Sequence, residues 1–236
     1  MHTKWVCLLL LASMYGLAGS AQSVSISPTT LVLDGKNQID TVTIRNQADH
    51  ESIYELAGYR WTQRDEQDVL TLDKAFVVTP PVITLAPGQE RVVRVGLLPQ
   101  DAPASLEHAY RLRISELAAS TAGPEAGLNV RLQLLLPIFS PGRDRDLALD
   151  FSAKRESDGS LCVVGDNIGT THAKLVWIAA AGDMDRKTPL QKYILAGKQG
   201  TMCTDASLDM GEKLTIGVTS AYEHDIFPYE ISVSAP

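Results

Sequence analysis

The sequence predicts an all-β protein folded as two β-sandwich domains. Two segments, 110–114 and 128–134, alternate strictly between apolar and polar residues, and this period of 2 is typical of strands rather than helices. Between the short apolar segments, turn-forming residues recur at roughly the 8 to 12 residue spacing that is expected of a sandwich. No long helical pattern interrupts the series. These observations favour antiparallel strands joined by short turns.

The first half of the chain contains one series of predicted strands. Segments 24–26 and 31–33 form a strand that Pro28 interrupts, and the Asp34-Gly35 pair then suits a tight turn. Strand-length units bounded by glycine, proline, asparagine or aspartate follow. They are residues 41–46, 54–61, 76–78, 82–85, 91–95, 110–114 and 128–134.

A second series of strands begins after a charged turn at residues 143–146, where the local composition changes. Its members are residues 147–151, 161–164, 173–178, 191–195, 213–218 and 229–233. Removing a 21-residue leader from 236 residues leaves 215, which fits one large domain or two ordinary ones. The two series favour two, with boundaries at 22–142 and 143–236.

Residues 1–21 have the pattern of a secretory signal peptide. A basic start at His2 and Lys4 precedes an apolar run at 5–12 and small residues before the expected cleavage after Ala21. The run is too short to span a bilayer of about 30 Å comfortably. We therefore expect an exported chain. Its net charge of −7 provides no basic field for nucleic acid, which we exclude as a partner.

Two cysteines remain after processing, because Cys7 lies in the leader. Cys162 and Cys203 form an even pair in an oxidising compartment, which favours a disulfide between them. A metal site and two free buried thiols are the alternatives. Two isolated thiols without nearby partner ligands give the metal site little support.

The chain lacks the motifs of common enzymes. It has no G-x-S-x-G elbow, no phosphate-binding loop and no H-E-x-x-H pair. His50, His108, His172 and His224 are scattered singly, and we interpret each as a surface or turn histidine. We therefore expect no catalysis, no metal, no cofactor and no small-molecule substrate.

Several motifs, in order, resemble the periplasmic chaperones of the chaperone–usher pathway for pilus assembly. The N-terminal ones are residues 24–26, 33–35, 42–46, 80–89, 93–95, 110–117 and 134–141. In the second half, residues 166–169 and 193–197 are similar to the family's asparagine-glycine turn and its tyrosine-containing motif, although Ala196 stands where proline is usual. Single motifs are weak evidence, whereas six or more in the correct order are strong.

The resemblance implies a fold and a function. It implies two immunoglobulin-like β-sandwich domains in a boomerang arrangement, located in the periplasm. It also implies that the protein binds and stabilises pilus or fimbrial subunits by donor-strand complementation and delivers them to an outer-membrane usher. The donated strand would present Leu128, Val130, Leu132 and Leu134 on one face. The alternative is that these four side chains face the protein's own core.

The site that would anchor the subunit's terminal carboxylate departs from the best-known branch of the family. Thr30 and Leu136 stand where that branch has an arginine and a lysine, and segments 61–70 and 136–139 look more like the archaic branch. Guanidinium groups suit bidentate capture of a carboxylate. The candidate replacements are Arg91, Arg94, Arg111 and Arg113.

Glu107 aligns with a glutamate that joins the two domains in similar proteins. Its usual arginine partner falls at Ser140, so Arg143 or Arg145 would have to substitute, or Glu107 is a free surface carboxylate. An exported adhesin or pilus subunit is the alternative function. Subunits are normally single domains with an N-terminal donor extension, whereas this chain carries its donor pattern internally.

Overall fold

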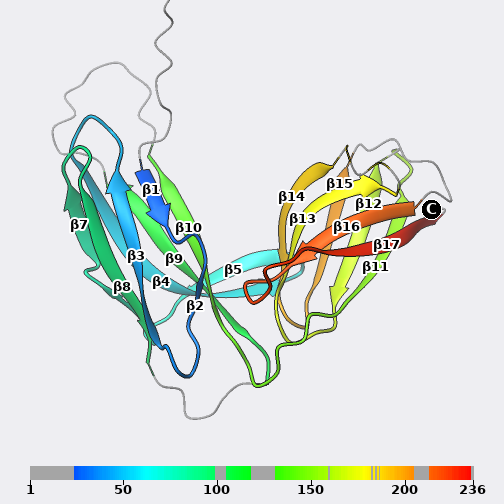
Figure 1. The fold of residues 1–236 in the computed structure, drawn as a ribbon, viewed down its shortest axis with the longest axis horizontal. Helices are drawn as coiled ribbons and strands as arrows, with labels where there is room; N and C mark the ends of the chain where they lie inside the picture. The colour runs from blue at the N-terminus through cyan, green and yellow to red at the C-terminus, as the bar shows by residue number, and fades with distance from the viewer. Residues whose placement is uncertain are drawn as a thin grey trace, which may run out of the picture.

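The computed structural model describes residues 24–98, 105–117, 131–158, 160–181, 183, 185, 187–204 and 213–234. These residues form strands and turns, arranged as two β-sandwiches that meet at an angle (Figure 1). The predicted all-β fold and its boomerang arrangement are thus confirmed. Within the described part of the chain, no helix has the length and apolarity needed to cross a membrane.

The N-terminal sandwich has a four-stranded sheet and a six-stranded sheet. The first has the order β1 (Val24–Ser27), β3 (Ile39–Asn46), β8 (Glu90–Leu97) and β6 (Phe76–Thr79). The second has the order β2 (Leu31–Val32), β10 (Gln133–Ser140), β9 (His108–Leu117), β4 (Ser52–Arg64) and β5 (Gln67–Leu72), and β7 (Val82–Leu85) also pairs with β4.

Alternating side chains from both sheets fill the core between them. Val42 and Ile44 point inward from β3, and Leu56, Leu112 and Ile114 meet them from β4 and β9. Strand β1 precedes Pro28 and belongs to the first sheet, whereas β2 follows Pro28 and belongs to the second, so the chain changes sheets at this proline. This agrees with the predicted interruption, since proline cannot donate a ladder hydrogen bond.

The C-terminal sandwich is built from the remaining strands, in the order β14-β13-β16-β17-β11-β12-β15. Their bounds are β11 Leu149–Arg155, β12 Leu161–Asn167, β13 Ala173–Ala180, β14 Thr188–Ile194, β15 Gln199–Thr204, β16 Lys213–Thr219 and β17 Phe227–Ser234. Cys162 on β12 and Cys203 on β15 are directly opposite in the ladder and form a disulfide.

Three differences from the sequence-based prediction concern strands. β5 and β15 were not predicted, because neither has a strong apolar alternation. The predicted strand at 128–134 is displaced: β10 begins at Gln133, and Arg131 and Leu132 precede it outside any strand. The paired register with β9 begins at Gln133 opposite Ser115, and one further backbone bond runs from the Glu116 N–H to the Leu132 carbonyl. Leu128 and Val130 lie outside the described residues.

Candidate functional site

Strand β10 has a backbone edge that is covered over only part of its length. On one side it pairs with β9 from Gln133 to Ser140. On the other side, in the described part of the chain, β2 pairs with it only at Ile138 and Phe139. Residues 133–136 therefore present an open strand edge, which is a template for the addition of another strand.

The predicted donor row continues along this strand from the core outward. Ile138 and Leu136 belong to the core and are 0% and 6% exposed, whereas Leu134 packs on the core from its rim and Leu132 is half-buried. The alternative interpretation, that these side chains face the domain's own core, therefore holds for the C-terminal end of the row. Towards its N-terminal end the row emerges from the core beside the open edge.

Two of the four candidate arginines lie on β9, next to β10. The guanidinium of Arg111 is already occupied by contacts within the protein. It stacks 3.6 Å from the centre of the Trp61 ring, and its Nη1 donates to the Leu135 carbonyl at 3.3 Å. Tyr193 of the second domain lies on the same guanidinium at 5.3 Å. Burial lowers the pKa of Arg111.

Arg113 is the more available of the two. It pairs with Leu135 in the β9–β10 ladder, its guanidinium lies 4.7 Å from the Tyr59 ring, and its one ion pair among the described residues is with Glu55 at 3.6 Å. Its buried Nε has no hydrogen-bond partner among the described residues. The Arg113 side chain is 31% exposed, so part of its charge is accessible beside the open edge.

Arg91 and Arg94 are not brought to this place. Both are exposed on β8, where they pair with Ile44 and with Thr41 and Thr79, in the four-stranded sheet that does not contain β10. The sequence could not separate the four arginines, because alternation gives the face of a strand but not the sheet to which the strand belongs.

The domains meet through a small apolar cluster. Trp61, Ala109 and Phe139 of the N-terminal domain pack on Leu195, and Tyr193 and Tyr222 cover them from the C-terminal domain. Trp61 and Tyr193 contact edge to face at 5.4 Å. Such aromatic pairs add about 0.5–1.5 kcal/mol beyond the area that they bury.

Glu107 joins the two domains, but its partner is His172 rather than an arginine. The two side chains are 1% exposed, with Nδ1 of His172 2.9 and 3.0 Å from the carboxylate oxygens, and the His172 amide donates to the same carboxylate. The interpretation of His172 as a surface or turn histidine is therefore wrong. Arg145 pairs instead with Asp34 at 3.6 Å.

The surroundings of His172 fix its tautomer. The Ala221 amide donates to Nε2 at 3.0 Å, so Nδ1 carries the proton that is donated to Glu107. The ring also stacks on Phe139 at 3.5 Å with an angle of 8°. Burial and the nearby Glu107 raise the pKa of Tyr222, which keeps this neighbouring hydroxyl neutral. A buried histidine with this role left no signal in a single sequence.

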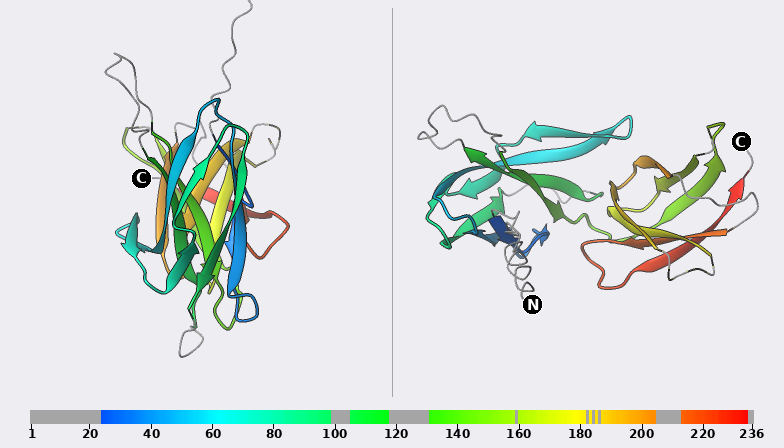
Figure 2. Two further views of the ribbon diagram at one scale, coloured as in Figure 1. Left: turned by 90° about the vertical axis from the view of Figure 1, so that its left-hand side faces the viewer. Right: turned by 90° about the horizontal axis from the view of Figure 1, so that it is seen from above.

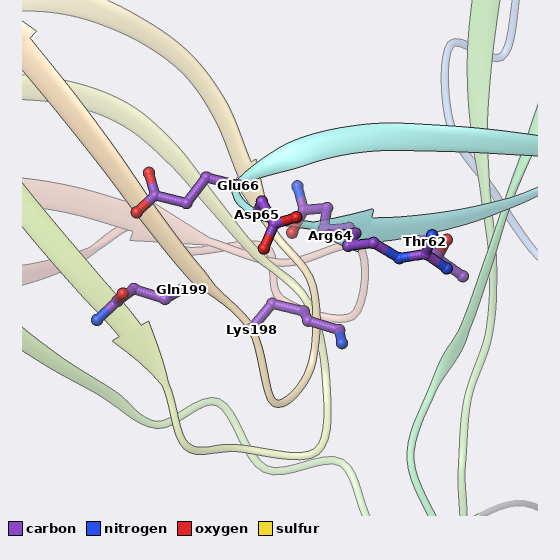
Figure 3. Close-up of a pocket in the computed structure, with 7 residues that line it drawn as sticks. Thr62, Arg64, Asp65, Glu66, Lys198 and Gln199 are labelled. Carbon is purple, nitrogen blue, oxygen red and sulfur yellow. The ribbon is translucent and has the colours of Figure 1, made fainter.

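A second contact between the domains is made by the β4–β5 hairpin, which sequence reasoning missed. Its tip surrounds a polar pocket of about 540 Å³ together with Lys198, which follows β14, and Gln199, the first residue of β15 (Figure 3). The pocket is open and lined by opposite charges. The sequence gives little signal for the hairpin, because residues 62–68 are all polar and only Val69, Leu70 and Leu72 of β5 are apolar.

The described residues contain no group of three histidine, cysteine, aspartate or glutamate side chains that could hold a metal ion. What the geometry offers is a binding surface: an open strand edge, an apolar row that emerges beside it and a cation next to both. These are the elements of β-strand addition, in which backbone bonds give affinity and alternate side chains give specificity.

Comparison with known proteins identifies the class. Residues 23–141 match the family described as pili and flagellar-assembly chaperone, PapD N-terminal domain. No curated protein matches the chain in sequence.

Among solved structures, the chain is similar to one in the CsuC–CsuE chaperone–tip adhesion subunit pre-assembly complex from archaic chaperone-usher Csu pili of Acinetobacter baumannii. The TM-score is 0.65 at 16% identity, covering 91% of this chain and 100% of that one. A chain in the Salmonella enterica SafA pilin–SafB chaperone complex gives 0.64 at 13%, covering 89% and 96%. The E. coli chaperone DraB gives 0.62 at 15%, covering 90% and 97%.

At these identities the structural likeness shows the fold, that of two-domain chaperones with immunoglobulin-like sandwiches. The family match and this fold together define a two-domain assembly chaperone. The family match extends over half of the sequence, and the chain belongs to the pili and flagellar-assembly chaperones of the PapD type. Its function is accordingly that of a pilus-assembly chaperone.

Proposed function

We propose that this chaperone captures pilus subunits by donor-strand complementation along the open edge of β10. The observation that carries the proposal is the coincidence of an unpaired edge at 133–136 with an apolar row that leaves the core beside it. The row would comprise Leu128, Val130, Leu132 and Leu134, of which the first two lie outside the described residues.

The physical argument concerns what an unfinished subunit lacks. A sandwich that misses one strand exposes an apolar groove between two unpaired edges, and such a species aggregates. A donated strand completes the ladder and fills the groove with alternate side chains. Four fully buried side chains would supply on the order of 6 to 12 kcal/mol before the cost of ordering is subtracted.

Arg113 is the residue that we propose as the anchor for the subunit's terminal carboxylate. It lies in register with Leu135 beside the open edge, and the carboxylate of Glu55, its ion-pair partner, is about half exposed and therefore weakly held. Arg94 supplies the matched control, since it is an exposed arginine on the other sheet. Arg113→Ala should weaken capture in a pull-down, whereas Arg94→Ala should not.

Location and delivery complete the proposal. The leader-like segment at residues 1–21 supports export to the periplasm, and the disulfide between Cys162 and Cys203 suits that oxidising compartment. Membership of the family supports transfer of the captured subunit to an outer-membrane usher. The donor strand would then be exchanged, so the complex has to be stable yet dissociable.

The decisive experiment places a carboxylate on each face of the donor segment. The chaperone is co-expressed with the exported subunits encoded beside its gene, and complexes are isolated by pull-down. Leu132→Asp should fold and lose the subunit, because its carboxylate would be desolvated in the groove without a counter-charge. Gln133→Asp is the matched control, because its side chain is exposed on the opposite face.

The proposal fails if Leu132→Asp melts like the wild type and still retains the subunit. Polymerisation of the wild-type protein, in place of a dissociable one-to-one complex, would favour the alternative of a pilus subunit or structural adhesin.

A further inference from the structure

The β4–β5 hairpin reaches from the N-terminal domain across to the C-terminal one. In the ribbon it is the cyan pair of strands that extends to the start of the second sandwich (Figures 1 and 2). β4 is 13 residues long, and its last residues, from Tyr59 to Arg64, pair with β5 beyond the part that pairs with β7. The hairpin tip is therefore a projecting element rather than a part of the core.

Two side chains of the hairpin bond to the backbone of the second domain. Gln63 is buried, its Oε1 accepts from the Leu195 amide at 2.9 Å, and its Nε2 donates to the Tyr193 carbonyl at 2.9 Å. The side-chain amide thus takes the place of a neighbouring strand at the end of β14.

Glu66, at the tip of the hairpin, makes the second contact with the C-terminal domain. Its carboxylate accepts from the Thr201 amide at 2.7 Å and from the Thr201 hydroxyl at 2.9 Å, both on β15. Figure 3 shows this side chain extending from the tip away from Arg64 and Thr62. A carboxylate that accepts two such bonds is a stronger and more directional hold than a neutral acceptor.

The backbone conformation of the tip favours glycine at position 66, so the presence of glutamate there points to a role for its side chain. Asp65 and Glu66 have φ of 49° and 61°, and they form the two-residue turn between paired Arg64 and Gln67. Turns with two positive φ values favour asparagine-glycine or aspartate-glycine, because glycine adopts this conformation without strain. Glycine at position 66 would relax the turn but remove the carboxylate.

Among the described residues, the hairpin (through Gln63) and the Glu107–His172 pair both place buried polar side chains between the domains, whereas the Arg145–Asp34 pair is partly exposed. The first two hold different elements of the second domain, since His172 precedes β13 while Gln63 and Glu66 bond to β14 and β15. A single contact would allow the domains to rotate about it, whereas two separated contacts fix the angle between the domains.

We propose that the β4–β5 hairpin is a strut that fixes the angle between the domains, and that Glu66 is a positioning residue for subunit capture. The strut would fix in advance the angle between the C-terminal domain and the open edge of β10, so that binding does not have to select one angle among many. This part rests on the proposed function, because subunit capture is one of its two readouts.

The test uses paired glycine variants of the full mature chaperone. Glu66→Gly removes the hold on Thr201, whereas Asp65→Gly relaxes the neighbouring positive φ and leaves that hold in place. Both should melt cooperatively near the wild-type temperature. Glu66→Gln keeps one acceptor oxygen and should restore part of the effect.

The first readout needs no subunit. Residual dipolar couplings of each domain should give one common alignment tensor for the wild type and Asp65→Gly, and two different tensors for Glu66→Gly. The second readout is the affinity for the subunit that co-purifies with the wild type. If the competent angle is populated a tenth of the time in Glu66→Gly, its affinity should fall about tenfold.

A common tensor in Glu66→Gly would overturn the role of Glu66 in fixing the angle between the domains. Separate tensors with unchanged affinity would overturn the positioning role and leave the proposed function intact. A wild type that captures no subunit would instead contradict the proposed function, and the tensors would still decide the strut.

Discussion

Strand β10 has a covered half and an open half, although one alternating apolar row runs through both. In the covered half, from Leu136 to Phe139, every side chain is buried, with Leu136 and Ile138 in the core and Phe139 against the second domain, although the backbone edge of Leu136 is still open. Among Gln133, Leu134 and Leu135 none is, and Leu135 is 39% exposed. The same sequence pattern thus builds the molecule at one end of the strand and presents a binding edge at the other.

The difference has a physical origin in the neighbours rather than in the strand. The covered half has β2 on its edge and Trp61 and His172 against Phe139. The open half has β9 alone among the described elements. Substitutions in the covered half should therefore act on stability, and those in the open half on capture.

The largest effect is expected from a charge in the covered half. Ile138→Asp would bury a carboxylate without a partner at a site with no exposure, and the cost should exceed much of the roughly 5–15 kcal/mol that holds a domain. Thermal melting followed by circular dichroism should show an unfolded N-terminal domain. A cooperative transition near that of the wild type would contradict the contrast between the halves.

A milder pair of substitutions compares neighbours in the same row. Leu136→Ala should lower the free energy of unfolding by about 2–5 kcal/mol, because it leaves a cavity in the core. Leu134→Ala should cost only about 1 kcal/mol, as expected for a half-buried side chain, while weakening subunit capture by roughly tenfold. Urea titrations and pull-downs check the two values. Equal losses of stability would contradict the proposed boundary between core and binding side chains in this row.

The covered half also carries the contact with the second domain. Glu107→Ala removes the acceptor for the buried Nδ1 and backbone N–H of His172, and should cost about 2–5 kcal/mol. Calorimetry should resolve a loss of coupling between the domains. Arg145→Ala, which removes only the partly exposed pair with Asp34, should leave this coupling nearly unchanged.

The disulfide lies in the second sandwich, away from both halves of β10. Replacing Cys162 and Cys203 by serine opens a loop with a sequence separation of 41 and should cost about 2–4 kcal/mol. The loss should appear in the second domain, and subunit capture should persist at low temperature. Before substitution, thiol labelling of native protein should detect no free cysteine; two reactive thiols would contradict the bond.

The smallest effect should come from Asp34, which follows the short strand β2. Amide hydrogen bonds from Asn37 and Lys36, and the charge of Arg145, lower its pKa from 3.8. A depressed folded pKa gives stability that is present above pH 3.8 and lost as the pH falls through the folded value. Asp34→Asn should therefore lower the melting temperature slightly at neutral pH and not at all in strong acid.

Much of the fold followed from the sequence. Alternation and turn residues located most of the strands, the interruption at Pro28 and the two series separated by the charged turn. They failed at β5 and β15, whose exposed faces carry too few apolar residues, and at the Asp65-Glu66 turn, which lacks the glycine that marks such turns. The resemblance to a family supplied the donor row and the four arginines but could not rank them.

What the sequence determined by itself is local, namely which residues alternate, where the chain turns and which cysteines can pair. What the tertiary structure decided is which neighbour each side chain meets. Glu107 bonds to His172, which is 65 residues away in the sequence, and Gln63 bonds to Leu195, which is 132 residues away. Arg113 rather than Arg94 lies beside β10. The reason is physical: burial and pairing depend on elements that are remote in sequence, whereas periodicity reports only the face on which a residue stands.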